Sequence, residues 1–259
     1  MSEEKIREEM MNEERLRQMI EAGEAAELSE YIKENNPIDV AQAAEYLDDE
    51  ELWKMCSILS SDDIASVLEQ ADDELRVRFT YALSNNELLE IFSNMAQDDI
   101  ADIVGDLTIG RRKTIVNLMK DKDRTEITNL LEYPADTAGG IMATEFLAIN
   151  EEMTMDETIA YLRKQAPDYE TPYYLYVVDD GNILKGVVQL RQIITCDSNV
   201  KIKDEMITQV ISVDVHTDQE QVAILFEKYG FAAIPVIEKE TNEILGIITF
   251  DDIMGVISE

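Results

Sequence analysis

FAAIPVIEKETNEILGIIT, residues 231–249, is the stretch that decides the fold of the second half of this chain. Its β-branched and aromatic residues form two runs with polar residues between them, a pattern typical of strand–turn–strand. YYLYVVDDGNILKGVV, residues 173–188, repeats the pattern, and its Gly186 matches Gly246 at an offset of 60 residues. The sequence therefore predicts two copies of one structural unit.

An amphipathic segment precedes each copy and another follows it. MDETIAYLRKQ (155–165) and DQEQVAILFEKYG (218–230) come before the strands, whereas LRQIIT (190–195) and FDDIMGVI (250–257) come after them. The order β-α-β-β-α therefore occurs twice. This predicts two α+β modules that pack as a pseudo-two-fold pair.

The first half of the chain has a helical pattern almost without interruption, and Pro37 is its only proline before Pro134. Short segments open on Ser, Asp or Asn, which cap helices, and apolar residues follow at helical spacing. Helices of about 12 residues are unstable alone, so they are expected to form a superhelical stack. The repeat is supported by residues that coincide at an offset of 36, namely Leu47/Leu83, Glu51/Glu87, Leu52/Leu88, Asp62/Asp98, Asp63/Asp99, Ile64/Ile100 and Ala65/Ala101.

The charge of the chain is strongly negative, with 56 Asp and Glu against 22 Lys and Arg, a formal −34. Residues 1–135 carry −19 and residues 136–259 carry −15, so the excess is spread over both halves. Such a chain repels phosphate backbones, which argues against nucleic acid as a partner, and it attracts cations. Cys56 and Cys196 make no disulfide framework. The charged start and the short apolar runs predict a soluble, cytosolic polypeptide.

Two motifs connect these halves to a known family. EYPADTAGGIMATEF (132–146) lies at the junction, and GIITFDD (246–252) closes the second strand pair. With the acidic helical repeat, they resemble the cytosolic region of MgtE-type magnesium transporters, an N-domain followed by a CBS pair. The fold class implied is multidomain α and α+β, with an N-domain at 1–134 and CBS domains at 135–200 and 201–259, the first beginning with a linker at 134–141.

The resemblance also implies partners. In this family a connecting helix and a membrane channel domain follow the CBS pair, so the chain is expected to be a soluble fragment from the cytoplasmic face of the membrane. A homodimer through the CBS domains is implied as well, with exposed apolar helix faces as its physical motive.

The richest acidic site in the repeat contains Asp98 and Asp102, which share one helix face with Asp106. Carboxylates suit a hard, oxygen-seeking cation, although helix capping with solvated neighbours explains the same residues. The resemblance favours the metal, because the family places Mg2+-bridging acids on this helix. The repeat-equivalent Asp62 and Asp63 predict a weaker site, since Ser66 replaces the second acid.

Four further acids are candidate magnesium ligands on the CBS side. Asp251 and Asp252 open the last helix, and Asp218 and Glu220 open the one before it. Capping again explains some of them without a metal. Where relatives can carry further acids this chain has glycine, which predicts fewer or rearranged ions.

A nucleotide site is the competing interpretation of the CBS pair. Gly246, Thr249 and Asp252 fit the family pattern that places a hydroxyl near phosphate and a carboxylate on ribose, whereas the first copy has Gln189 and Gln192 at the Thr and Asp positions. Further family positions, which contact the base and the phosphates of ATP, are matched by Tyr174, Arg191 and Phe231. Core packing explains the aromatic residues equally well.

Two functions therefore remain open from the sequence. The first is a Mg2+-sensing regulatory region of a transporter, in which ions bridge the two acidic domains, favour a closed state and inhibit uptake. The alternative is an adenine-nucleotide-sensing CBS module whose helical repeat contacts a partner protein. No enzyme is expected, since the chain has no P-loop, Gly-x-Ser-x-Gly or dinucleotide fingerprint.

Overall fold

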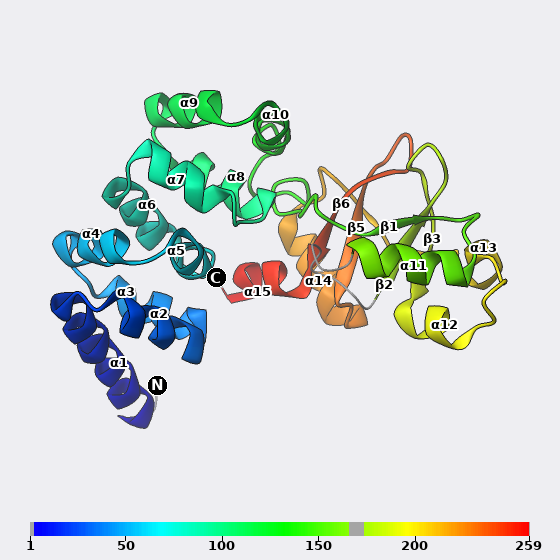
Figure 1. The fold of residues 1–259 in the computed structure, drawn as a ribbon. Coiled ribbons are helices and arrows are strands. Elements are labelled where there is room, and N and C mark those ends of the chain that lie inside the picture. Colours follow the sequence, from blue (N-terminus) through cyan, green and yellow to red (C-terminus); the bar gives the residue numbers. More distant parts are fainter. Residues whose placement is uncertain (1–2, 166–173, 259) are drawn as a thin grey trace. The chain divides into compact units, whose positions relative to one another are not determined.

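The computed structural model describes residues 3–165 and 174–258. The chain divides into two compact units, one up to Thr128 and the other from Asn129 onward, and each is described here by itself. Figure 1 labels the helices of both and all of the strands except β4.

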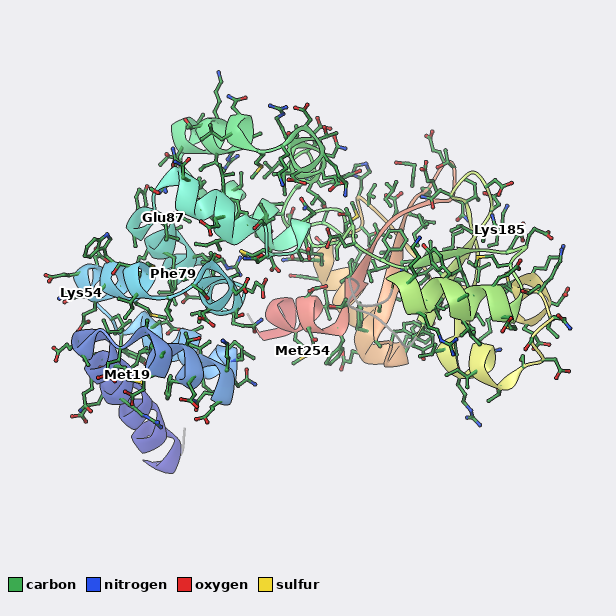
Figure 2. All side chains as sticks on the ribbon, viewed as in Figure 1. Met19, Lys54, Phe79, Glu87, Lys185 and Met254 are labelled. Atoms are coloured by element: carbon green, nitrogen blue, oxygen red, sulfur yellow. The ribbon has the colours of Figure 1, made fainter. Side chains whose placement is uncertain are left out.

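The first unit is a stack of short helices, as the sequence predicts (Figure 1). Alternate helices pack on one another, so that α1, α3, α5, α7 and α9 form one series and α4, α6 and α8 another. Phe79, labelled in Figure 2, is fully buried at the centre of this packing. The helices are α1 (Glu3–Ala22), α2 (Ala25–Glu34), α3 (Pro37–Glu45), α4 (Asp49–Ile58), α5 (Ser61–Leu68), α6 (Asp73–Ala82), α7 (Asn85–Phe92), α8 (Gln97–Asp106), α9 (Ile109–Leu118) and α10 (Asp121–Leu130), which runs into the second unit.

The helix boundaries follow from local side-chain chemistry. Asn36, Asp48, Ser60, Asp72 and Ser84 each accept a hydrogen bond from a backbone N–H in the first turn of the following helix. Such caps satisfy amide groups that have no partner within the helix. The capping prediction is therefore confirmed for these helices, but it is wrong for α8 and α9, where Ala96 and Thr108 make no side-chain cap.

Arginine side chains from later helices donate hydrogen bonds to backbone carbonyls near the C-termini of earlier helices. The Arg78 guanidinium donates to the carbonyl of Leu47, and that of Arg111 donates to the carbonyl of Leu83 at 2.9 Å. Leu47 and Leu83 are equivalent positions of the 36-residue repeat. Because the last carbonyls of a helix lack internal partners, these arginines tie one repeat to the next.

The second unit contains two three-stranded sheets, ordered β1-β2-β3 and β4-β5-β6 (Figure 1). In each sheet the first pair of strands is parallel and the second antiparallel. The predicted β-α-β-β-α order is thus confirmed twice, with one additional short helix between the modules. The elements are β1 (Ala148–Asn150), α11 (Met155–Gln165), β2 (Tyr174–Val178), β3 (Leu184–Gln189), α12 (Leu190–Thr195), α13 (Ile202–Glu205), β4 (Val213–Asp214), α14 (Gln219–Tyr229), β5 (Ala233–Glu238), β6 (Glu243–Thr249) and α15 (Phe250–Ser258).

Each module is entered by a segment that pairs with the other module. Ala143, ahead of the first module, exchanges two main-chain hydrogen bonds with Ile247 in β6, at 2.8 and 2.9 Å. Ile207, ahead of the second, does the same with Val187 in β3, at 3.0 and 2.9 Å. This exchange holds the two modules together as one body.

Two glycines make the exchange possible. A Cβ on Gly186 would lie 2.7 Å from the sulfur of Met206, and one on Gly246 would lie 2.9 Å from that of Met142. Any side chain at either position would therefore displace the entering segment. The offset of 60 residues between the glycines reflects this shared requirement for close backbone approach.

The two hairpin turns also bond to each other. Asn182 and Asn242 both have a φ of 62°, a left-handed conformation that asparagine tolerates. The Asn182 side chain donates to the carbonyl of Ile244 at 2.9 Å, and the Asn242 side chain donates to that of Leu184 at 2.8 Å. This reciprocal pair has the pseudo-two-fold relation predicted from the sequence.

The cysteines are free thiols, and burial raises the pKa of Cys56 to about 12. Within the described ranges, every helix is too short or too polar to cross a bilayer.

Candidate functional site

The first turn of α8 concentrates acidic side chains in the helical unit. Asp98 is half-buried, with its Oδ1 atom shielded from solvent, whereas Asp102 is exposed one turn further on. The Arg76 guanidinium lies 3.7 Å from Asp102 Oδ2. Asp98 and Asp102 thus lie on one helix, four residues apart, as expected.

Asp99 is the unusual carboxyl of this turn. Burial first, and then the charges of Asp98, Glu69 and Asp102, together raise the pKa of Asp99 to about 8, against the lowering effect of Arg76. The carboxyl resists ionisation because loss of solvent and neighbouring negative charge both oppose its charged form. Burial also raises the pKa of Asp106, in the last turn of the same helix.

The sequence pattern includes Asp99 in the acidic run of α8 but assigns it no role, and it does not single out Glu69. Asp99 directly follows Asp98 in the chain. It therefore lies on a different face of α8 from the one that Asp98, Asp102 and Asp106 were expected to share. Glu69 follows α5 and reaches this turn only through tertiary packing. The only signal in the sequence was the match of Asp99 to Asp63, which is itself buried.

In the second unit, Asp252 caps α15. Its Oδ2 accepts hydrogen bonds from the backbone N–H and the hydroxyl of Thr249, at 2.8 and 2.7 Å. Asp251 beside it is exposed. The capping interpretation therefore holds for Asp252, and the carboxylate presents a fixed orientation at the start of the helix.

Asp218 caps α14 from the position before the helix, because its Oδ1 accepts from the backbone N–H of Glu220 at 2.8 Å, whereas Asp252 lies within the first turn of α15. The side chains of Asp218 and Glu220 are both exposed at this helix start. Throughout the described part of the chain, no three His, Cys, Asp or Glu side chains are grouped so as to hold a metal ion. The acids instead form separate pairs on α8, α14 and α15.

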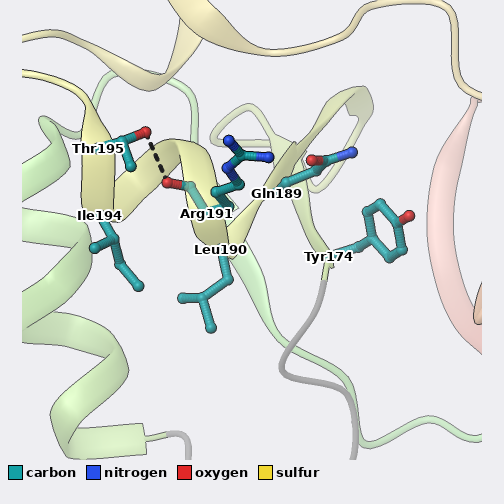
Figure 3. Close-up of a pocket in the computed structure, with 6 residues that line it drawn as sticks. All are labelled: Tyr174, Gln189, Leu190, Arg191, Ile194 and Thr195. Carbon is teal, nitrogen blue, oxygen red and sulfur yellow. Dashed lines mark hydrogen bonds between the residues drawn. The ribbon is translucent and has the colours of Figure 1, made fainter.

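A pocket of about 440 Å³ lies in the first module (Figure 3). Tyr174, at the start of β2, and Arg191, on α12, both line it, together with Gln189, Leu190, Ile194 and Thr195. The Thr195 hydroxyl donates to the Arg191 carbonyl at 2.9 Å, which is drawn as the dashed line in Figure 3. An aromatic ring and a guanidinium at one pocket suit a ligand that has a flat ring and negative charge.

The other predicted nucleotide residues lie outside the set that lines this pocket. The ring of Phe231 stacks on Tyr229 with centroids 5.3 Å apart, and Thr249 is buried. In the first module, Gln192 Oε1 accepts from the backbone N–H of Gln189 at 3.0 Å. Gln192 thus reproduces the cap that Asp252 makes in the second module, without its charge.

Comparison with known proteins identifies the class that this fold defines. The family model described as the MgtE intracellular N domain matches residues 35–136, and the CBS domain model matches 138–199 and 202–259. The chain belongs to the MgtE family and contains its intracellular N domain followed by a CBS pair.

Particular relatives agree with this assignment. The protein named magnesium transporter MgtE from Thermus thermophilus is 33% identical over 248 residues, covering 93% of this chain and 54% of that protein. MgtE from Enterococcus faecalis is 45% identical over 134 residues, which cover 52% of this chain and 29% of that protein. The chain therefore spans about half the length of the Thermus relative.

Two solved structures match nearly the whole chain. One is described as the soluble part of a magnesium transporter, with a TM-score of 0.85, 30% identity, and coverage of 96% of this chain and 98% of that chain. The other is the cytosolic domain of the Mg2+ channel MgtE in complex with ATP, with a TM-score of 0.86, 33% identity, and coverage of 93% and 98%. The fold class predicted from the sequence is confirmed by both.

Proposed function

We propose that this chain is a magnesium-sensing regulatory region, in which Mg2+ bridges the acidic face of the helical unit and the CBS pair. The observation that carries the proposal is the first turn of α8, where burial and crowded acids raise the pKa of Asp99 to about 8. We choose magnesium as the ion because the relatives are named magnesium transporters.

The donor chemistry of the chain fits magnesium. Mg2+ is a hard cation that retains several waters and takes one or two carboxylates from a protein site. Pairs such as Asp98 with Asp102, or Asp251 with Asp252, therefore suffice when two acidic surfaces share the ions. Asp218 and Glu220 are further ligands in this proposal.

Electrostatics gives the proposed switch its direction. The helical unit and the CBS pair both carry a large negative charge, and their repulsion acts over a Debye length of about 8–10 Å. Ions at a shared interface convert that repulsion into attraction. Because such ions bind only when the surfaces meet, magnesium favours the closed arrangement. In a longer protein with a channel domain, closure would inhibit ion uptake.

A second candidate function is sensing of adenine nucleotides. The pocket that contains Tyr174 and Arg191 supports it, as does the relative solved in complex with ATP. In this proposal the Tyr174 ring stacks on the base and Arg191 contacts phosphate, while Phe231, Thr249 and Asp252 complete the site. The two proposals both use the Asp252 carboxylate. Mg2+ and ATP would therefore compete for this side chain.

The assembly proposed with this function is a homodimer through the CBS domains, at the cytoplasmic face of a membrane. Exposed apolar side chains on the helices of the second unit provide a physical motive, since Ile194, Ile224 and Met254 are 66%, 60% and 41% exposed. Figure 2 shows Met254 on α15.

Small-angle scattering with Mg2+ and with chelator tests the magnesium proposal. The radius of gyration is expected to fall as Mg2+ rises, and monovalent salt at matched ionic strength should reproduce little of the change. Asp252→Asn should weaken the response, because the amide oxygen can keep the cap on Thr249 while the charge is lost.

Superimposable scattering profiles with Mg2+ and with chelator would refute domain closure. Titration calorimetry with ATP on the same chain then decides whether nucleotide sensing takes first place. Arg191→Ala should lose ATP binding and leave the magnesium response intact.

A further inference from the structure

Residues 133–141, which follow the helical repeat, lie against the second CBS module. The backbone N–H groups of Ala138 and Gly139 donate to the carbonyls of Thr217 and Val215, at 2.7 and 2.8 Å. In return, the carbonyl of Asp136 accepts from the N–H of Gln219, the first residue of α14, at 2.9 Å. We call residues 133–141 the strap, and we call residues 215–219, to which it bonds, its seat.

The strap fits its seat closely. Ala138 is fully buried, and a Cβ on Gly139 would lie 2.7 Å from the ring of Tyr133 and 3.0 Å from the carbonyl oxygen of Val215. The backbone of Gly139 has no positive φ, so the position needs glycine for space alone. The Tyr133 ring in turn lies 6.3 Å, centroid to centroid, from the ring of His216.

The seat is organised by the second module itself. Asp214 holds the loop between β4 and α14, because its two carboxylate oxygens accept from the backbone N–H groups of His216 and Lys239, at 3.0 and 3.2 Å. Asp218 then caps α14 directly after the seat. The seat therefore has hydrogen bonds of its own in addition to those with the strap.

The fastened strap leaves a very short connection to the helical unit. Helix α10 ends at Leu130 and the strap begins at Tyr133, so only residues 131 and 132 lie between them. If the strap leaves its seat, the next fixed point is Ala143, which pairs with Ile247. The connection then lengthens to residues 131–142.

We propose that the strap is a fastening that sets the effective concentration of the helical unit at the CBS pair. This inference rests on the proposed magnesium bridging, because that effective concentration determines how much Mg2+ closure requires. Once a flexible connection is longer than the distance it must span, effective concentration falls roughly as the −3/2 power of its length. On that basis, lengthening the connection from two residues to twelve is expected to lower the effective concentration on the order of tenfold.

Hydrogen exchange on the whole 259-residue chain tests the fastening without magnesium. The amides of Ala138, Gly139 and Gln219 are expected to exchange slowly in chelator, with protection close to that of the β5–β6 ladder. Exchange of Ala138 and Gly139 at the rate of an unstructured peptide would overturn the strap, whatever magnesium does.

A matched pair of glycine variants tests the coupling. In Gly139→Ala the new Cβ meets the Tyr133 ring at 2.7 Å and the Val215 carbonyl oxygen at 3.0 Å, so this variant is expected to loosen the strap, whereas Gly110→Ala is the control, because a Cβ on Gly110 meets nothing within 4 Å. In Gly139→Ala we expect lost protection at Ala138, faster proteolysis between residues 131 and 142, and a Mg2+ midpoint of compaction raised about tenfold. The control should match the wild type in all three.

Tyr133→Ala supplies a second route if Gly139→Ala misfolds, since it removes the ring that covers Gly139 without adding a clash. An unchanged Mg2+ midpoint in a variant whose strap amides have lost protection would overturn the coupling. Failure of the wild type to compact with Mg2+ would refute the proposed function, and the coupling with it. The exchange experiment still decides whether the strap is fastened.

Discussion

The first turns of α5 and α8 have nearly the same sequence, SDDIAS at 61–66 and QDDIAD at 97–102, but place their second aspartate in different surroundings. Asp63 accepts a hydrogen bond from the Ser60 hydroxyl at 2.8 Å, and Lys33 lies 3.8 Å away. At the equivalent Asp99, Ala96 replaces the serine, and the nearby charges are mostly acids.

The comparison shows that the same short motif can place a carboxylate beside its own hydrogen-bond and charge partners in one helix and mostly among other acids in another. In α5 the protein supplies the partners of the acid, so the turn is complete. In α8 the charges that act on Asp99 are mostly negative, which agrees with the cation bridging proposed above. The following predictions test this difference, beginning with the largest expected effect.

Removing the acids of α8 is expected to weaken the compaction by Mg2+ more than any other change considered. Asp98→Asn with Asp102→Asn is expected to raise the Mg2+ midpoint of compaction at least about tenfold, since each lost carboxylate removes a ligand and a charge. Asp39→Asn with Glu90→Gln removes the same charge from exposed positions on α3 and α7, and should leave the midpoint within about twofold. Equal shifts in both double variants would mean that net charge, and not a site on α8, governs the response.

The pH dependence of stability should reveal Asp99. In the unfolded chain this carboxyl ionises near pH 4, whereas its pKa in the folded protein is raised to about 8. The folded state thus holds a proton that the unfolded state has released, and the free energy of unfolding should fall as pH rises from about 4 to about 8. We expect a loss on the order of 2 kcal/mol between pH 5 and pH 8 in chelator.

Urea denaturation of wild type and Asp99→Asn across that pH range isolates this contribution, because other groups titrate alike in both proteins. The difference between the two proteins should grow toward pH 8 and then level off. A difference independent of pH would show that Asp99 ionises normally.

The same substitution should have opposite effects at the two equivalent positions. At pH 8 in chelator, Asp99→Asn should stabilise the protein by about 1–2 kcal/mol, because it removes a charge that burial and neighbouring acids oppose. Asp63→Asn should destabilise it by about 1 kcal/mol, because it weakens the bond to Ser60 and the attraction to Lys33. Thermal melting of the two variants is sufficient, and shifts of the same sign would contradict the comparison.

The smallest effect is expected from exchanging the residues that precede the two helices. Ser60→Ala removes a cap and should cost about 1 kcal/mol or less, whereas Ala96→Ser supplies a hydroxyl to α8 and should stabilise by a similar or smaller amount. Melting temperatures in chelator measure both. If Ala96→Ser destabilises the protein, the first turn of α8 differs from that of α5 in more than its cap.

Much of the fold was predictable because it depends on neighbours in the chain. The caps at Asp48, Ser60 and Ser84 set the starts of their helices by local hydrogen bonds, and the 36-residue repeat follows from equivalent packing. The two strand pairs were equally predictable, because β-branched runs on either side of a turn indicate a hairpin from local sequence alone.

The candidate site was predictable only in part. Asp98 and Asp102 were found from their spacing, and Tyr174 and Arg191 do line one pocket. The magnesium and nucleotide roles of all these residues stay predictions. Asp99 and Glu69 were missed, because the pKa of Asp99 depends on burial and on an acid that lies 30 positions earlier in the chain.

By itself, the sequence determined the helix starts, the doubled α+β module, the excess of acids and the membership of a family, all of which depend on residue type and spacing. Only the tertiary structure decided three other features. It packs Met142 against Gly246 and Met206 against Gly186. It also bonds the backbone N–H of Gly139 to the carbonyl of Val215, and it shields Asp99 from solvent beside other acids. The physical reason is the same in each case: close approach and loss of solvent depend on segments far apart in the chain, whose meeting no local pattern encodes.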